Sequence, residues 1–398
     1  MNNLKNLQLQ FNSLAIFRNL LASPVIKKLE ALIFTVDNAY CDSAHRVRAY
    51  SDFVSELYQH GSNLSDYIYN FVIEDENFYI KSKAKGLKLD DTVENALTSE
   101  LAILQNLSRL TSDTVKSFLD YDGFLPDWNI SEHDFTKLYE NRIENVSKQG
   151  FGIFSKYHMF AVSDGNIVPV KHPDSQSLSS FSSYERERNL VIKNTLTLIN
   201  GDKASNVLLY GDAGTGKSST IKAVVNQYKD EGLRLVEVKK HQLFGLPDIL
   251  EELAENPLKF IIFIDDLSFS ENDDNFTALK ALLEGSVTAM NQNIVIYATS
   301  NRRNLVKEQY LNRASSDDLR VNDTLQETAS LSARFGLIVT FQKPDKDTYL
   351  SIATDLAASH GVPVDEQFYI KAEAFALRNN GRSPRAAKQF VELQKSGI

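Results

Sequence analysis

The stretch NVLLYGDAGTGKSST, residues 206–220, contains the pattern that decides the fold. Gly211 to Ser218 match the phosphate-loop pattern G-x-x-x-x-G-K-[ST] in full, after an apolar run and before a helix-forming run. Glycines in such a loop let backbone N–H groups turn toward phosphate oxygens, and the positive end of the following helix adds to the attraction. We therefore expect a strand, a phosphate-binding loop and a helix here, with a nucleotide as ligand.

Individual residues of this loop have expected roles. The residues expected to bind the nucleotide are Gly211, Asp212, Ala213, Gly214, Thr215, Gly216, Lys217, Ser218 and Ser219. Lys217 should reach the β- and γ-phosphates, and the hydroxyl of Ser218 should bind Mg²⁺. A glycine-rich turn that matches by chance is the alternative, but the strand, the helix and the Lys-Ser pair are all in place.

A second apolar run, FIIFI at residues 260–264, ends in two aspartates. We expect Asp265 to hold the Mg²⁺, because a phosphate loop needs a metal partner and no other predicted strand ends in an acid. The alternative is that the aspartates only cap the strand. Asp266 stands where a water-activating acid belongs, but such acids are often glutamates, which are one methylene longer. The sequence thus leaves open whether ATP is hydrolysed or only bound.

The pattern along the chain predicts four parts. Residues 184–343 alternate helices with short apolar strands, which indicates an α/β core with a parallel sheet covered on both faces. Residues 1–155 have apolar positions at helical spacing and predict a helical domain. Residues 156–183 predict a β-hairpin followed by a serine-rich linker, and residues 344–398 predict a helical lid.

Composition limits the classes of function. The net charge of −9 over 398 residues argues against a general nucleic-acid binder, although a local basic patch stays possible. The single cysteine, Cys41, excludes an internal disulfide and a multi-cysteine zinc site. No apolar run reaches the roughly eighteen residues of a membrane span. We expect a cytoplasmic protein that does not enter a membrane.

The order of these parts resembles that of the AAA+ ATPases: a P-loop strand, an acidic strand, a third strand with a polar end, an arginine before the last strand, and a lid. An uncharacterised bacterial family of predicted AAA+ ATPases is similar to this chain over about residues 180–394. The stretches that carry this resemblance are LLYGDAGTGKSS, FIDDLSF, IYATSNRRNL, SLSARFGL and GRSPRAAKQF. The resemblance implies an ATPase core with a lid and with ATP and Mg²⁺ as cofactors.

The resemblance also implies roles for single residues. Asn301, at the end of the third strand, corresponds to the sensor 1 residue that orients the attacking water. Arg334 corresponds to an arginine finger that reaches the γ-phosphate of a neighbouring subunit; a structural salt bridge is the alternative. Arg385 corresponds to sensor 2 in the lid, with Arg382 as the competing candidate. The segment at Tyr184 occupies the place that usually touches adenine.

Together these expectations favour ATP hydrolysis coupled to the remodelling or regulation of a protein partner. Asp266 would act as base, with Asn301 and Arg334 completing the site, in a homo-oligomer. The N-terminal helical region would select the partner. Two alternatives stay open: an ATP-gated binding module without turnover, and a DNA-associated ATPase like the helicase loaders, against which the acidic balance counts.

Overall fold

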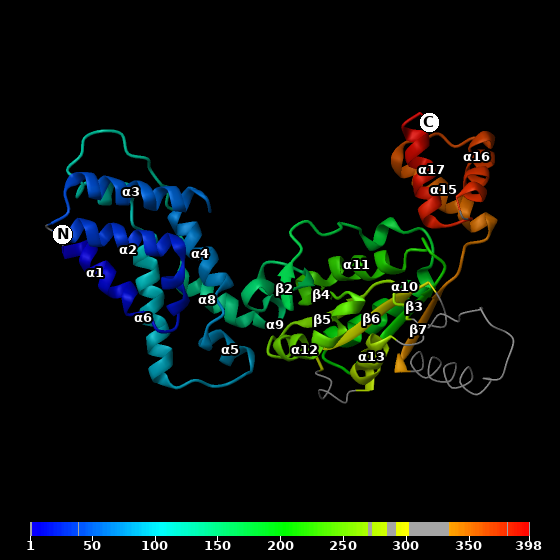
Figure 1. Ribbon diagram of the computed structural model, residues 1–398, viewed down its shortest axis with the longest axis horizontal. Coiled ribbons are helices and arrows are strands. Elements are labelled where there is room, and N and C mark those ends of the chain that lie inside the picture. The colour runs from blue at the N-terminus through cyan, green and yellow to red at the C-terminus, as the bar shows by residue number, and fades with distance from the viewer. Residues whose placement is uncertain are drawn as a thin grey trace. The chain divides into compact units, whose positions relative to one another are not determined.

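The computed structural model describes residues 2–38, 40–269, 273–284, 292–301, 334–379 and 381–397. Contacts divide the chain into two compact units, Met1–Lys156 and Tyr157–Ile398. The first unit is helical, and the second combines a sheet with helices (Figure 1).

The N-terminal unit is built from amphipathic helices around one core. Its helices are α1 (Asn2–Asn12), α2 (Pro24–Asp37), α3 (Ser43–Tyr58), α4 (Leu64–Glu74), α5 (Phe78–Ala84), α6 (Asp91–Ser108), α7 (Ser112–Lys116), α8 (Phe135–Glu144) and α9 (Val146–Gln149), with 3₁₀ turns η1 (Arg18–Ala22) and η2 (Gly152–Ser155). Ser23 caps α2 by accepting a hydrogen bond from the backbone of Ile26. The buried carboxylate of Glu100, on α6, accepts the backbone N–H groups of Ala15, Ile16 and Phe17 at 2.8–3.1 Å. This carboxylate therefore joins α6 to the turn after α1.

The second unit contains a seven-stranded sheet of order β2-β1-β4-β5-β6-β3-β7. The strands are β1 (Met159–Ser163), β2 (Asn166–Pro169), β3 (Val207–Gly211), β4 (Leu233–Glu237), β5 (Lys259–Ile264), β6 (Ile294–Ser300) and β7 (Leu337–Phe341). Neighbouring strands are parallel except β1 and β2, which form a hairpin. The hairpin belongs to the sheet, since β1 pairs with β4 in the register Met159↔Leu235.

Helices cover this sheet and form a separate lid. They are α10 (Glu185–Ile199), α11 (Lys217–Tyr228), α12 (Leu246–Ala254), α13 (Asp274–Glu284), α15 (Lys346–His360), α16 (Glu366–Arg378) and α17 (Pro384–Lys395), with 3₁₀ turns η3 (Leu178–Ser180), η4 (Lys229–Glu231) and η5 (Lys240–Gly245). Figure 1 shows α11 on one face of the sheet and α12 on the other. Because both faces are covered, β5 is apolar from Phe260 to Ile264 without alternation. The predicted fold class, a largely parallel sheet flanked by helices with a helical lid and a helical N-terminal region, is confirmed.

The sheet order places three strand ends side by side. β3 lies between β6 and β7, and β5 lies next to β6, so the phosphate loop, Asp265 and Asn301 all follow the carboxyl edge of the sheet. Open α/β sheets bind their ligands at this edge. Among the helices that the structure describes, none has the length and apolar character needed to span a membrane.

Candidate functional site

The backbone of the phosphate loop has conformations that favour glycine. Gly211, Gly214 and Gly216 have φ angles of +139°, +79° and +94°. A Cβ atom on Gly211 would lie 1.9 Å from the carbonyl oxygen of Phe341, in the neighbouring strand β7. The loop can therefore leave the sheet at this point only because residue 211 has no side chain.

Asp265 is held by two hydroxyl groups. The Oγ of Ser218, on the first turn of α11, donates to Oδ1 of Asp265 at 2.6 Å, and the hydroxyl of Thr299 on β6 donates to the same oxygen. A carboxylate beside a hydroxyl is a donor set that suits Mg²⁺, which prefers oxygen and usually completes its shell with water and substrate phosphate. No group of three or more acidic, histidine or cysteine side chains gathers as a metal site in the described ranges. The pair formed by Ser218 and Asp265 thus fits a Mg²⁺ that arrives with a phosphate ligand.

The backbone at Asp266, two residues after the end of β5, leaves the extended conformation of the strand. Its φ angle is +50°, an uncommon value that aspartate tolerates better than most residues. Its N–H lies within hydrogen-bond distance of Oδ1 of Asp265 (3.1 Å) and of the hydroxyl of Thr299 (3.0 Å). Its Oδ1 accepts the side-chain amide of Asn301 at 2.8 Å. This turn directs the two successive carboxylates to different partners.

Lys217 is buried at the start of α11. Its ammonium group donates to the carbonyl oxygens of Gly211 (2.8 Å) and Asp212 (2.7 Å) and to Oδ1 of Asn301 (3.0 Å). Burial lowers the pKa of Lys217, while the nearby carboxylates of Asp212, Asp265 and Asp266 oppose that shift. Asn301 therefore links the lysine of the phosphate loop to Asp266, with its two amide atoms in fixed roles.

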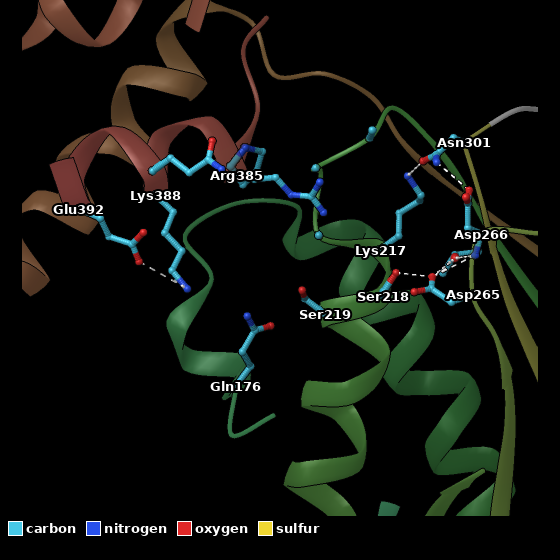
Figure 2. Close-up of a pocket in the computed structure, with 16 residues that line it drawn as sticks. Gln176, Lys217, Ser218, Ser219, Asp265, Asp266, Asn301, Arg385, Lys388 and Glu392 are labelled. Atoms are coloured by element: carbon cyan, nitrogen blue, oxygen red, sulfur yellow. Dashed lines mark hydrogen bonds and ion pairs between the residues drawn. The ribbon is translucent and has the colours of Figure 1, made fainter. Parts of the chain in front are cut away.

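One cavity of about 680 Å³ contains these groups (Figure 2). Its volume is in the range of small-molecule sites. The residues lining it are Gln176, Ala213, Gly214, Gly216, Lys217, Ser218, Ser219, Asp265, Asp266, Thr299, Asn301, Pro384, Arg385, Lys388, Gln389 and Glu392. The structure thus brings ten of the predicted site residues together around one space.

Four other predicted residues do not line this cavity. Gly211 and Thr215 support the backbone of the loop. Gly211 packs closely against Phe341 of β7, and the hydroxyl of Thr215 donates to the carbonyl oxygen of Asp212 at 2.9 Å. The carboxylate of Asp212 accepts the backbone N–H of Lys343 at 3.2 Å. Arg334 precedes β7, at the opposite end of the sheet from the loop.

The lid presents one of its two candidate arginines to the cavity. Arg385, in the first turn of α17, lines the cavity, and its backbone N–H donates to the carbonyl of Gly214 at 3.2 Å. Arg382 instead forms a forked ion pair with Glu373 within the lid, with Nε lying 3.0 and 3.2 Å from the two carboxylate oxygens. The hydrogen bond from Arg382 lowers the pKa of Glu373. Of the two arginines, only Arg385 is placed for contact with a ligand in this cavity.

Sequence reasoning missed the residues at the far end of the cavity. These are Gln176, from the linker after the hairpin, and Lys388, Gln389 and Glu392, from α17. No sequence motif marks these residues. The only available signal for the three lid residues was their position one or two helical turns after Arg385 on the same helix. Tyr184 lines a different cavity of about 410 Å³, where its hydroxyl donates to the carbonyl of Gln342 at 2.6 Å.

A known protein family matches nearly all of the second unit. Residues 155–397 match the family described as "Protein of unknown function (DUF815)". The chain belongs to the DUF815 family. The match confirms the expected membership of an uncharacterised family, and it begins before the hairpin, about 25 residues earlier than the resemblance suggested. No curated protein sequence matches this DUF815 member.

Solved structures similar to this DUF815 protein include AAA+ proteins. A Thermotoga maritima RuvB variant has a TM-score of 0.38 and 17% identity, and the aligned region covers 54% of this chain and 63% of RuvB. The FIGL-1 AAA domain in complex with ADP has a TM-score of 0.39 and 15% identity, covering 57% and 74% of the two chains. C. elegans PCH-2 has a TM-score of 0.37 and 18% identity, covering 56% and 65%. The chain thus spans less than two thirds of the length of the RuvB and PCH-2 chains.

Proposed function

We propose that this protein binds ATP with Mg²⁺ and hydrolyses it. The observation that carries the proposal is the meeting, in one cavity, of Lys217, the pair formed by Ser218 and Asp265, and the pair formed by Asp266 and Asn301. These are a phosphate-binding cation, a metal-binding pair, and an acid with its orienting amide. Phosphoryl transfer depends on positioning and on charge stabilisation, and these groups supply both.

Each group has a distinct task in this proposal. Lys217 and the N–H groups of the loop would bind the phosphates, and Mg²⁺ held by Ser218 and Asp265 would neutralise charge on the transferring group. Asp266 would accept a proton from the attacking water, whose oxygen forms the new bond to the γ-phosphorus as the bond to ADP breaks. The amide of Asn301 would orient this water against Asp266. Because Asp266 already reaches Asn301 at 2.8 Å, its shorter side chain does not keep it out of the cavity.

Arg385 would contribute a second cation from the lid. Its side chain extends toward the phosphate loop in Figure 2, and its backbone N–H donates a hydrogen bond to the carbonyl oxygen of Gly214. Arginine in the first turn of a helix is unfavourable beside the helix dipole unless an anion is near, and a phosphate would supply that anion. We therefore assign Arg385 to the nucleotide.

Arg334 would act on a second copy of the chain. In the parallel pairing of β3 with β7, Gly211 is opposite Phe341, and Arg334 lies three residues before β7 begins. The four residue steps of β7 alone span about 13 Å. The arginine is therefore too far from its own phosphate loop, and it can serve a nucleotide only if a neighbouring subunit presents one.

The test of hydrolysis compares wild type with Asp265→Asn, Asp266→Asn and Asp266→Glu, measuring steady-state ATP turnover and nucleotide affinity on the same samples. We expect Asp266→Asn to lose about 10²–10⁴-fold in turnover while it still binds ATP, because a general base supplies that much. Asp266→Glu should retain turnover, and Asp265→Asn should weaken binding that depends on Mg²⁺. If wild type and Asp266→Asn both turn over at the background rate, the protein is an ATP-gated binding module instead.

The test of Arg334 uses mixtures. Arg334→Ala and Asp266→Asn should each be inactive alone, but a mixture should regain part of the activity, since mixed oligomers contain interfaces with both groups intact. Turnover by Arg334→Ala alone at the wild-type rate, independent of protein concentration, would remove the proposed arginine finger. A mixture as inactive as its components would argue that the two residues do not meet across subunits.

We further propose that the N-terminal unit selects a protein partner in the cytoplasm, which ATP turnover remodels or regulates. This unit has its own core and exposes large apolar side chains, among them Phe34 and Phe124, at 60% and 87% exposure. Capture by the full-length Asp266→Asn variant in ATP should retain a partner that is released in ADP. Retention of DNA instead, with an affinity that falls steeply with salt, would favour the DNA-associated alternative.

A further inference from the structure

Gln176 lies in the part of the cavity away from Lys217 and Asp265, as Lys388 and Glu392 of the lid also do. In Figure 2 Lys217, Asp265 and Asn301 lie on one side, Gln176 lies on the other, and Ser219 lies between them. All belong to the same continuous space of about 680 Å³. If the phosphate loop binds a nucleotide's phosphates, the space past Ser219 toward Gln176 is open to the rest of the nucleotide.

The backbone of Gln176 is fixed to the helix that carries the phosphate loop. The side-chain amide of Asn226, on α11, donates to the carbonyl oxygens of Asp174 (2.8 Å) and Gln176 (2.9 Å). Oδ1 of Asn226 in turn lies 3.0 Å from Nε2 of His158, at the start of the hairpin. The linker segment is therefore part of the wall of the site, at a set distance from Lys217.

The side chain of Gln176 has an unused acceptor. Its Oε1 atom is buried and has no hydrogen-bond partner among the residues that the structure describes. A buried acceptor without a donor costs free energy, so a ligand that supplies a donor at this place is favoured over one that does not. Gln389 lies on the lid wall of the same cavity, but its side chain is exposed, so water can satisfy its oxygen.

We propose that Gln176 selects the base of the bound nucleotide by accepting a hydrogen bond from an exocyclic amino group, as adenine carries at C6. A carboxamide is the side chain that commonly recognises this edge of adenine. A base with a carbonyl oxygen at C6 would place an acceptor against Oε1. This inference rests on the proposed nucleotide site, and it replaces Tyr184 as the expected contact to the base, because Tyr184 lines the separate cavity.

The test measures the equilibrium affinities of ATP, GTP and inosine triphosphate, each with Mg²⁺, for the full-length protein and its variants. Inosine triphosphate keeps the ribose and phosphates of ATP but has an oxygen at C6. We expect wild type to bind ATP about 5- to 150-fold more tightly than inosine triphosphate, the discrimination that one well-made base contact supplies. In Gln176→Leu this ratio should fall to nearly one, mainly through weaker binding of ATP.

Two further variants separate recognition from structure. Gln176→Glu keeps the acceptor, so it should keep the preference for ATP even if its charge weakens all three nucleotides. Gln389→Leu removes the other carboxamide of the cavity and is the matched comparison. An unchanged ratio in Gln176→Leu, or a loss of preference in Gln389→Leu alone, would overturn the assignment of Gln176. Equal affinities of wild type for all three nucleotides would overturn it as well, whereas failure of wild type to bind any of them would reject the nucleotide site itself.

Discussion

The hydrogen bond between Asn301 and Asp266 offers a quantitative test of the proposed catalytic arrangement. In Asn301→Ala, Asp266 loses the amide that donates to it at 2.8 Å, while Lys217 keeps two of its three acceptors, the carbonyls of Gly211 and Asp212. The damage should therefore fall on the orientation of Asp266 and of the water, and hardly on the binding of phosphate. We expect lower turnover with little change in ATP affinity.

The size of the loss follows from the kind of hydrogen bond. A hydrogen bond to a charged group contributes about 1.5–3 kcal/mol, and the lower part of that range applies because this pair is exposed. A loss of about 1.5–2 kcal/mol in the transition state corresponds to a fall of about 10- to 30-fold in kcat. The assay is steady-state ATP turnover at saturating ATP, with affinity measured separately by equilibrium binding.

A double-mutant cycle shows whether Asn301 acts through Asp266. If it does, adding Asn301→Ala to Asp266→Asn should change kcat by less than about 3-fold, since the residue it serves is already disabled. The arrangement would be refuted if the two losses multiplied in the double variant. A fall in ATP affinity equal to the fall in kcat would show instead that Asn301 acts mainly on the bound phosphates.

Three further predictions concern the supports of the site and of the N-terminal core. Gly214→Ala should lower the free energy of unfolding by about 1–2 kcal/mol, because a side chain at φ +79° is strained and its Cβ would lie 3.1 Å from that of Arg385. Thermal melts with and without ATP measure this loss. A smaller increase in melting temperature with ATP than in wild type would show that the lid contact matters for binding. Burial lowers the pKa of His158, so its neutral form is favoured in the folded protein. The contribution of neutral His158 to the free energy of unfolding should therefore be present above its ordinary pKa of about 6.5. It should be lost as the pH falls through the lower pKa of the folded state. In His158→Gln, urea unfolding should depend less on pH between 8 and 5 than in wild type, and parallel curves would contradict this assignment. Glu100→Ala should lower the free energy of unfolding of the full chain by about 2–4 kcal/mol, because the backbone N–H groups of Ile16 and Phe17 lose their acceptor inside the core. A loss below about 0.5 kcal/mol in urea titrations would show that these N–H groups find other partners.

The sequence alone was enough to predict the class of fold and the strand, glycine-rich loop and helix at residues 206–228. The loop is a contiguous pattern, and local backbone geometry places its glycines, Lys217 and Ser218 where the proposed roles need them. The apolar run of β5 likewise predicts a strand buried on both faces, because each face must exclude water. Such features depend on neighbours in the chain, which a local pattern records.

The tertiary structure decided the features that join distant segments. Asn301 meets Asp266 across 35 residues, and only the adjacency of β5 and β6, together with the left-handed turn at Asp266, brings them together. The choice of Arg385 over Arg382 depends on the ion pair of Arg382 with Glu373. Gln176 carries no motif; it enters the cavity because the hairpin joins the sheet beside β4 and Asn226 fixes the linker to α11. Strand order, side-chain competition and long-range anchoring arise only when the chain packs, so no local pattern contains them.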